Sequence, residues 1–332
     1  MPLEGISKAV VTGGAGFIGS RLTDRLIEDG VKVTVLDNLS NGALANIRNA
    51  DSPRLVFVES DCKDGPLECL RGADVIFHLA GNPEVRTGSS DTSVDFNENI
   101  LATYRLLEAA RKYEVPNFSF TSTSTVYGEA GAIPTPEDYS PLLPISTYGG
   151  SKLACEAMIS SFSSMFSIRS TVYRFANVTG EGTSHGVVFD FVRKLRSDPE
   201  RLEILGDGTQ RKSYIDIEDC VDGMVFALRQ PRPTNFDVFN LGSTDTIDVV
   251  SIGKIVADEM GLDPRFEIAG GVEGGRGWRG DVKVMQLDIS KISRLGWRPR
   301  FSSAESVRRA ARSLAGPRGA LLARRTIALR GR

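Results

Sequence analysis

Short runs of β-branched residues alternate with amphipathic stretches along the first half of the chain. Ile18, Leu22 and Leu26 recur at helical spacing and predict a helix with one apolar face. The predicted strands are residues 9–11, 33–36, 55–58, 75–77, 118–120 and 170–173. Strands that alternate with helices are typical of a parallel, doubly wound sheet. The pattern therefore predicts an α/β fold.

The second half shows a looser pattern, in which glycine-rich and polar loops separate shorter elements. In the first half we also expect a helix at residues 97–113. In the second half we expect a helix at 187–195 and a strand at 213–215. Asp248 is placed to cap a further helix. Residues 270–280 are rich in glycine and predict a loop.

These elements predict two domains. The first comprises residues 1–176, and segments at about 213–245 return to it. The second, residues 177–332, is expected to be a smaller mixed α/β lobe that binds the substrate. A chain of 332 residues is long enough for both.

Composition excludes several classes of function. The net charge of −2 and the pI of about 5.9 provide no general attraction to nucleic acid or membrane. No apolar run approaches the ~18 residues that span a bilayer, and an early strand leaves no room for a signal peptide. Four scattered cysteines and two histidines predict neither a disulfide framework nor a metal site. We expect a cytoplasmic protein.

A glycine motif lies between the first predicted strand and the first helix. Gly13 permits a tight turn, Gly16 lets the backbone approach a pyrophosphate, and Gly19 lets the helix pack closely on the strand. Phe17 and Ile18 open the helix, whose N-terminal N–H groups and dipole favour phosphates. The motif predicts a Rossmann-type, dinucleotide-binding fold.

Asp37 ends the second predicted strand, where dinucleotide-binding folds place the acidic residue that hydrogen-bonds the adenosine ribose. Its carboxylate can accept a hydrogen bond from a 2′-hydroxyl and would repel a 2′-phosphate. This favours NAD over NADP, although a solvated loop carboxylate is the simpler alternative.

Tyr148 and Lys152 are one helical turn apart and lie on the same face of a predicted helix. We expect the ammonium, together with the helix dipole, to lower the pKa of the phenol. Such a phenol can take a proton from an alcohol. The pair therefore predicts acid–base chemistry.

With these motifs, the chain resembles the extended short-chain dehydrogenases/reductases and, within them, the nucleotide-sugar epimerases that act on UDP-glucose or UDP-N-acetylglucosamine at C4. The resemblance runs from Val10 to about Pro299. Further matching segments are residues 37–42, 61–62, 78–81, 122–128, 174–177, 206–209 and 280–281.

The resemblance implies NAD as the cofactor and assigns residues to it. Besides the glycine motif and Asp37, these are Asn38, Ser40, Asn41, Gly42, Asp61, Cys62, Leu79, Ala80, Gly81, Asn99, Ser122, Tyr148, Lys152 and Phe175. Lys152 would hold the nicotinamide ribose, and Thr123 would hold the sugar's 4-hydroxyl beside Tyr148. The alternatives from residue type alone are a polar group on a helix surface for Asn99 and a strand-end hydroxyl for Thr123.

The resemblance also places a UDP-sugar. Thr123, Tyr148, Asn177 and Val187 would contact it, while Met285 stands at the position that gates the C2 substituent. Because methionine is flexible and intermediate in bulk, the sequence leaves N-acetylated and plain sugars open.

This chain lacks the two arginines that the resemblance leads us to expect at the UDP diphosphate. Lys212 stands where the family has arginine, so the contact falls to Lys212 or Arg211. Trp278 replaces a second arginine, and we assign its role to Arg276.

Residue differences within the family select a reaction. Dehydratases carry an acidic pair where this chain has Ser124 and Thr125, so 4-epimerisation of a neutral UDP-hexose fits better. No arginine occurs between Phe175 and Arg193 to capture a sugar carboxylate, although Arg86 keeps a uronate epimerase or decarboxylase open. A non-catalytic dinucleotide sensor is the alternative of another class, but sensors commonly lose the Tyr–Lys pair.

The resemblance further implies a homodimer through a four-helix interface formed by residues 97–113 and 148–166. Met158, Ile159 and Phe162 are placed either at that interface or in the core. His78 and His185 are predicted to be structural or loop residues, not catalysts. The basic terminus, residues 319–332, is predicted to be solvated.

Overall fold

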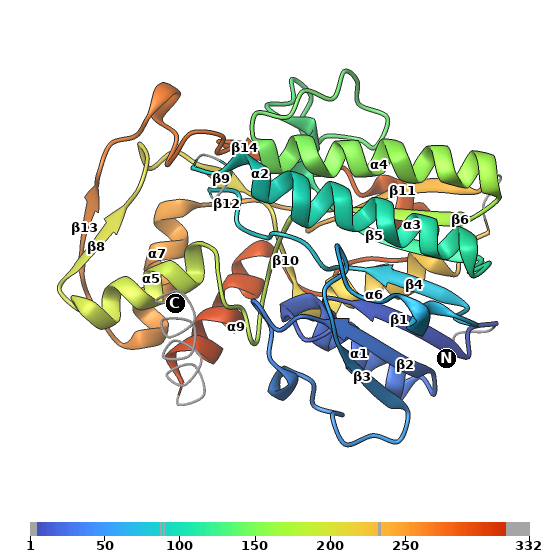
Figure 1. Ribbon diagram of the computed structural model, residues 1–332. Coiled ribbons are helices and arrows are strands. Elements are labelled where there is room, and N and C mark those ends of the chain that lie inside the picture. Colours follow the sequence, from blue (N-terminus) through green and yellow to red (C-terminus); the bar gives the residue numbers. More distant parts are fainter. Residues whose placement is uncertain (1–4, 87, 89, 232–233, 317–332) are drawn as a thin grey trace. The chain divides into compact units, whose positions relative to one another are not determined.

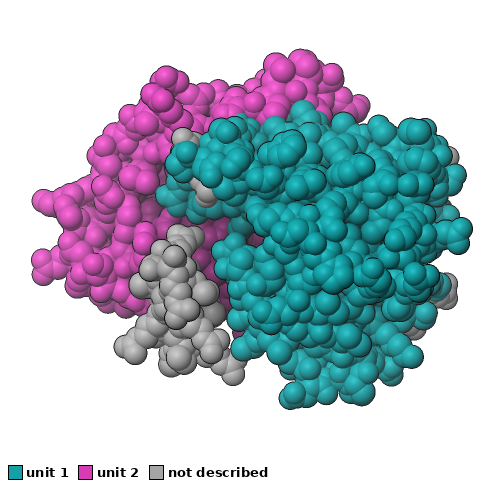
Figure 2. Space-filling view, in the orientation of Figure 1, with its two compact units in different colours: residues 1–126, 146–174, 221–239 teal, residues 127–145, 175–220, 240–332 magenta. Residues whose placement is uncertain are grey.

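The computed structural model describes residues 5–86, 88, 90–231 and 234–316, which fall into two compact units (Figure 2). Unit 1 contains the described residues of Met1–Val126, Ser146–Arg174 and Val221–Phe239. Unit 2 contains those of Tyr127–Ile145, Phe175–Cys220 and Asn240–Arg332.

Unit 1 is built on a seven-stranded sheet in the order β3-β2-β1-β4-β5-β6-β11 (Figure 1). The strands are β1 (Lys8–Thr12), β2 (Lys32–Asp37), β3 (Leu55–Glu59), β4 (Val75–His78), β5 (Asn117–Thr123), β6 (Arg169–Phe175) and β11 (Phe236–Leu241). β1 pairs in parallel with both β2 and β4. The strand order reverses between β1 and β4, where doubly wound sheets bind their ligands. The predicted Rossmann-type sheet is confirmed.

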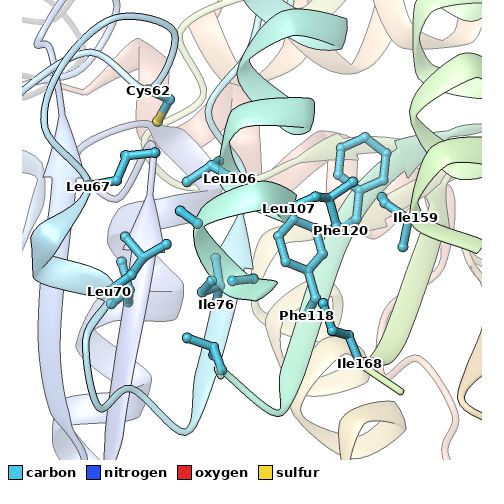
Figure 3. Packing of buried hydrophobic residues seen from close by; sticks show 14 of the residues in the cluster. Cys62, Leu67, Leu70, Ile76, Leu106, Leu107, Phe118, Phe120, Ile159 and Ile168 are labelled. Atoms are coloured by element: carbon cyan, nitrogen blue, oxygen red, sulfur yellow. The ribbon is translucent and has the colours of Figure 1, made fainter. Parts of the chain in front are cut away.

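Helices α3 and α4 lie side by side and cover one face of this sheet (Figure 1). Leu107 of α3 and Ile159 of α4 pack with Ile76, Phe118 and Phe120 of the strands (Figure 3). Ile159 therefore faces the core. The helical segments are α1 (Phe17–Glu28), η1 (Leu44–Asn46), η2 (Glu68–Leu70), α2 (Thr92–Asp95), η4 (Phe96–Leu101), α3 (Ala102–Lys112), η5 (Ser124–Tyr127), α4 (Thr147–Phe166) and α6 (Ile217–Leu228).

The helix predicted at residues 97–113 is irregular at its start, where η4 is a π-helix. The hydroxyl of Thr103 donates to the carbonyl of Asn99 at 2.6 Å, and the thiol of Cys155 donates to it at 3.4 Å. Side chains thus satisfy a carbonyl within the widened turn. Apolar periodicity does not reveal such a turn, but π-turns are frequent at functional sites.

Unit 2 is mixed α/β. Its elements are β7 (Asn177–Thr179), α5 (Val187–Ser197), β8 (Arg201–Ile204), β9 (Arg211–Lys212), β10 (Tyr214–Asp216), β12 (Ile247–Asp248), α7 (Val249–Met260), β13 (Arg265–Ile268), η6 (Glu273–Gly275), β14 (Val284–Met285), α8 (Ser290–Arg294) and α9 (Ser303–Ala315). Its strands form three small sheets, β7–β10, β8–β13 and β12–β9–β14. Phe191, Ile252, Val256 and Val307 pack between α5, α7 and α9.

Several local predictions hold in unit 2. The Asp248 side chain accepts a hydrogen bond from the backbone N–H of Ser251 at 2.8 Å, which confirms the predicted helix cap. The predicted helix and strand appear as α5 and β10. Across the described part of the chain, no helix is both long and apolar enough to cross a membrane. The basic segment at residues 319–332 lies outside the described residues.

Candidate active site

The glycine turn after β1 makes close backbone contacts. Gly13 has a φ of +68°, and a Cβ there would lie 2.7 Å from the backbone nitrogen of Ala80. A Cβ on Gly19 would lie 2.1 Å from the carbonyl oxygen of Gly13. Gly16, the N-cap of α1, makes no side-chain cap. No side chain therefore occupies the N–H groups at the start of α1, which lies where the strand order of the sheet reverses. These N–H groups can bind the phosphates of a dinucleotide.

Asp37 supports this turn instead of lying in solvent. The side chain is 7% exposed, and Oδ2 accepts a hydrogen bond from the N–H of Ala15 at 2.9 Å. Oδ1 accepts one from Leu39 at 2.8 Å. Burial raises the pKa of the Asp37 carboxyl, although both backbone hydrogen bonds lower it.

The other predicted cofactor residues of this region gather around Asp37. Gly42 closely approaches Ala15, since a Cβ on Gly42 would lie 2.8 Å from the Ala15 carbonyl. Nδ2 of Asn38 donates to Asp61 at 2.8 Å. Asn38, Ser40 and Asn41 are exposed, while Cys62 is buried in the core of unit 1.

Tyr148 is the second residue of α4, whose N-cap Ser146 accepts a hydrogen bond from the N–H of Gly149 at 3.1 Å. The phenol is hydrogen-bonded to Thr123 at the end of β5. Oγ1 of Thr123 accepts from the N–H of Thr125 at 3.2 Å and from its hydroxyl at 3.1 Å. Because Thr123 accepts these bonds, its own proton can point to the phenol oxygen.

The prediction that Lys152 lowers the pKa of the Tyr148 phenol is wrong for the protein chain without ligands. Burial raises the pKa of the phenol to about 12, and the charge of Asp95 also raises it. The hydrogen bond with Thr123 lowers this pKa without offsetting burial. Lys152 does not produce the expected lowering. It is 5% exposed, and desolvation lowers its own pKa.

Lys152, Asn99 and Gly81 lie close together. Nζ of Lys152 donates to the carbonyl of Thr121 at 3.0 Å. A Cβ on Gly81 would lie 2.6 Å from Oδ1 of Asn99 and 3.6 Å from Nζ of Lys152. Asn99 is 1% exposed and donates to Oγ of Ser151 at 2.8 Å, so it is not a helix-surface group.

Ser122, another predicted cofactor residue, belongs to a buried ion pair. Its hydroxyl donates to Glu156 at 2.5 Å, and Nη2 of Arg174 lies 2.6 Å from the same carboxylate. Both charged side chains are 5% exposed. Glu156 lies one turn beyond Lys152 on α4, and Arg174 lies on β6. The pair fixes the Ser122 side chain through its hydrogen bond to Glu156.

His78 links two parts of this region as a structural residue, as predicted. Its Nδ1 lies 2.8 Å from the hydroxyl of Thr12, and its Nε2 lies 3.0 Å from the hydroxyl of Thr103. Thr103 donates its proton to Asn99 and Thr12 accepts from Ala80, so Nε2 must carry the imidazole proton. Burial lowers the pKa of His78 to about 3.

This pKa predicts a pH dependence of stability. The unfolded chain binds a proton at His78 below pH ~6.5, whereas the folded chain does not until pH about 3. The free energy of unfolding should therefore fall by up to about 1.4 kcal/mol per pH unit below that point, or about 2 kcal/mol by pH 5. Denaturant unfolding at pH 7, 6 and 5 measures it. His78→Gln should lack this fall in unfolding free energy, and His185→Gln should retain it. If the unfolding free energies of wild type and His78→Gln changed equally with pH, His78 would not be its source.

Of the predicted substrate residues, Thr123 and Tyr148 belong to unit 1, and the others belong to unit 2. Asn177 opens β7, and its buried Nδ2 has no hydrogen-bond partner among the described residues. Lys212 and Met285 pair across β9 and β14, and Nζ of Lys212 lies 2.5 Å from the buried Asp281. The Arg211 side chain is 54% exposed.

Two further predicted residues are Val187 and Phe175. Val187, the first residue of α5, packs partly against the core of unit 2, and Phe175 is buried at the end of β6.

Arg276, assigned to the diphosphate, is engaged within its own unit. Nη2 lies 2.6 Å from Oε2 of Glu129, and Nε donates to Oε1 at 3.1 Å. Nη1 donates to the carbonyl of Glu273 at 2.9 Å. A phosphate would have to replace Glu129, which is itself 46% exposed.

Sequence reasoning missed Asp95, Asn82 and Thr125. Thr125 follows Thr123 in a run of hydroxyl residues, which is a usable signal for a hydrogen-bond relay. Asp95 and Asn82 carry no local signal, because only the folded chain brings them to the start of α4.

A doubly wound sheet, a glycine turn and the cluster of Tyr148, Lys152 and Thr123 define an enzyme of the extended short-chain dehydrogenase/reductase class. The profile of the NAD dependent epimerase/dehydratase family matches residues 9–242, and the chain belongs to this family. Membership confirms the prediction of an enzyme with NAD as its cofactor.

Relatives agree over nearly the full length. The UDP-glucose 4-epimerase of Mycolicibacterium smegmatis is 33% identical over 313 residues, which cover 90% of this chain and 96% of that protein. The crystal structure of a UDP-galactose 4-epimerase matches with a TM-score of 0.83 and 42% identity, covering 93% of this chain and 98% of that one. A UDP-glucuronic acid 4-epimerase from Bacillus cereus, solved with UDP-glucuronic acid and NAD, matches with a TM-score of 0.83 and 30% identity, covering 92% and 98%.

Proposed function

We propose that this enzyme inverts C4 of a UDP-hexose, either UDP-glucose/UDP-galactose or their N-acetylated counterparts. The observation that carries the proposal is the cluster of half-buried Tyr148 with buried Thr123 and Lys152. It lies beside Gly81 and Asn99, the residues assigned to the dinucleotide. A phenol paired with a hydroxyl suits proton transfer to and from a sugar alcohol.

Tyr148 removes the C4 hydroxyl proton, and Thr123 orients that hydroxyl. When bound, NAD supplies the acceptor and donor of the C4 hydride and the positive charge of an oxidised nicotinamide. Lys152 would hold the cofactor's nicotinamide ribose, with Asn99 nearby. After the 4-keto sugar turns over, C4 would receive the hydride on its opposite face while Tyr148 returns the proton to the C4 oxygen. The change of face inverts C4. NAD is regenerated in each cycle and should remain with the purified enzyme.

Unit 1 is the proposed NAD domain, and unit 2 supplies the proposed UDP ligands. The unpartnered amide of Asn177 supports its role, because a buried polar atom without a partner is costly unless a ligand satisfies it. Lys212 or Arg211 neutralises the diphosphate, and Arg276 contributes after releasing Glu129. Met285 leaves the C2 substituent open.

A uronate epimerase or decarboxylase is the second candidate, favoured by the likeness to the Bacillus cereus enzyme. Against it, the proposed carboxylate ligand Arg86 already donates to Glu84 at 3.1 Å. A dinucleotide sensor fits less well, because both Tyr148 and Lys152 are retained.

Incubation with UDP-glucose, UDP-N-acetylglucosamine and UDP-glucuronate, followed by separation of C4 epimers, tests the proposal. A C4 epimer of either neutral sugar is the expected product. Turnover of the uronate alone would replace the proposal with the second candidate, and no turnover of any of them would favour the sensor.

The proposal includes a cytoplasmic homodimer. Exposed Phe96 of η4, Tyr104 of α3 and Met165 of α4 support an interface on these helices. Light scattering that gave the mass of a monomer at working concentration would disprove it.

A further inference from the structure

A buried carboxylate that the proposed mechanism does not use lies at the start of α4. Asp95, the last residue of α2, is 1% exposed. Its Oδ2 accepts a hydrogen bond from Oγ1 of Thr147 at 2.7 Å, and its Oδ1 accepts one from Nδ2 of Asn82 at 3.0 Å. Thr147 is the first residue of α4 and directly precedes Tyr148.

The backbone at Gly88 closes over this contact. A Cβ on Gly88 would lie 1.9 Å from Oγ1 of Thr147 and 2.5 Å from Oδ2 of Asp95. Only a residue without a side chain fits there. Thr147 itself is exposed, but the close approach of Gly88 restricts the geometry of the contact by packing as well as by the hydrogen bond.

A second route joins Asp95 to the same turn. The backbone N–H of Asn82 donates to Oδ1 of Asn99 at 3.0 Å, and Nδ2 of Asn99 donates to Oγ of Ser151 at 2.8 Å. The Ser151 hydroxyl donates to the carbonyl of Tyr148 at 2.8 Å. Asp95 thus holds the first turn of α4 directly and through the residue assigned to the cofactor.

The charge of Asp95 acts on both catalytic groups. After burial, which dominates, this charge raises the pKa of the Tyr148 phenol. For Lys152, burial lowers the pKa, while Asp95 and Glu156 raise it. The other titratable groups around the pair are Cys155 on α4, His78 on β4, and Arg174 on β6, which neutralises Glu156.

We propose that Asp95 is a positioning residue of the active site, which anchors the first turn of α4 through Thr147 and keeps a negative charge beside the Tyr148–Lys152 pair. The inference rests on the proposed role of Tyr148. An epimerase must return the proton that it removes, and a charge that opposes phenolate favours that return. The same charge raises the pKa of the buried Lys152, against the larger lowering by burial.

Two variants distinguish the effect of the Asp95 charge from the effect of its hydrogen bond to Thr147. Asp95→Asn removes the charge with little change in shape, whereas Thr147→Val removes the hydrogen bond and keeps the charge. Phenolate absorbance near 295 nm is titrated in the NAD-loaded enzyme, with the Tyr148→Phe signal subtracted. This readout reports the phenol even if no sugar is turned over, so it is independent of the proposed function.

Asp95→Asn is expected to lower the pH midpoint of the Tyr148 phenolate titration by at least about half a pH unit. Thr147→Val is expected to leave the midpoint unchanged and to lower kcat without raising KM. A midpoint in Asp95→Asn that is equal to or above the wild-type value would overturn the proposal. If Asp95→Asn fails to fold, the anchor is tested by Thr147→Val against Thr147→Ser, which keeps the hydroxyl; equal kcat values for these two would overturn it.

Discussion

Tyr148→Phe is expected to lower turnover of the UDP-sugar by about a thousandfold, within the range usual for loss of an acid–base group. The ring can pack as before, but no hydroxyl remains to exchange a proton with the C4 oxygen. Thr123 loses its partner at the same position. Steady-state kcat and the NAD content of the purified variant together measure the effect.

NAD content should stay at the wild-type level, because the glycine turn and Asp37 are untouched. Tyr173→Phe is a matched control. Its buried phenol donates to the carbonyl of Met224 at 3.1 Å and has no assigned catalytic role. This control should lose about 1 kcal/mol of stability and retain turnover. A Tyr148→Phe enzyme that kept a tenth or more of wild-type kcat would refute the proton-transfer role.

Arg174→Met is expected to lower the free energy of unfolding by about 3–5 kcal/mol. The change leaves the Glu156 carboxylate buried without its cationic partner, while the Ser122 hydroxyl still donates to it. An isolated buried charge is costly because it has lost its solvation without compensation. Denaturant midpoints followed by circular dichroism measure the loss.

The double variant Glu156→Leu/Arg174→Met distinguishes the stranded charge from lost packing. Replacing both partners removes the charge, so the double variant should be more stable than Arg174→Met. Arg201→Met is the exposed control: its side chain is 55% exposed and pairs with Glu267 at 3.2 Å, so its loss should stay within about 1 kcal/mol. A double variant no more stable than Arg174→Met would argue that packing, not the stranded charge, dominates.

Local features of the active site were predictable from the sequence. The glycine turn, the strand before it and the helix after it depend on neighbouring residues, so periodicity and glycine spacing identified them. The one-turn spacing of Tyr148 and Lys152 is likewise a property of any helix. The π-turn of η4 was not predictable, because it depends on donors from Thr103 and Cys155.

By itself, the sequence determined the order of strands and helices, the backbone turn for a dinucleotide and the residue types available for proton transfer. These follow from local sterics and from the repeat of apolar positions. Only the tertiary structure decided that Ile159 faces the core, that Glu129 engages Arg276, and that Asp95 lies at the start of α4. It also decided the direction of the phenol's pKa, because burial and charges from distant segments outweigh a neighbour on the same helix.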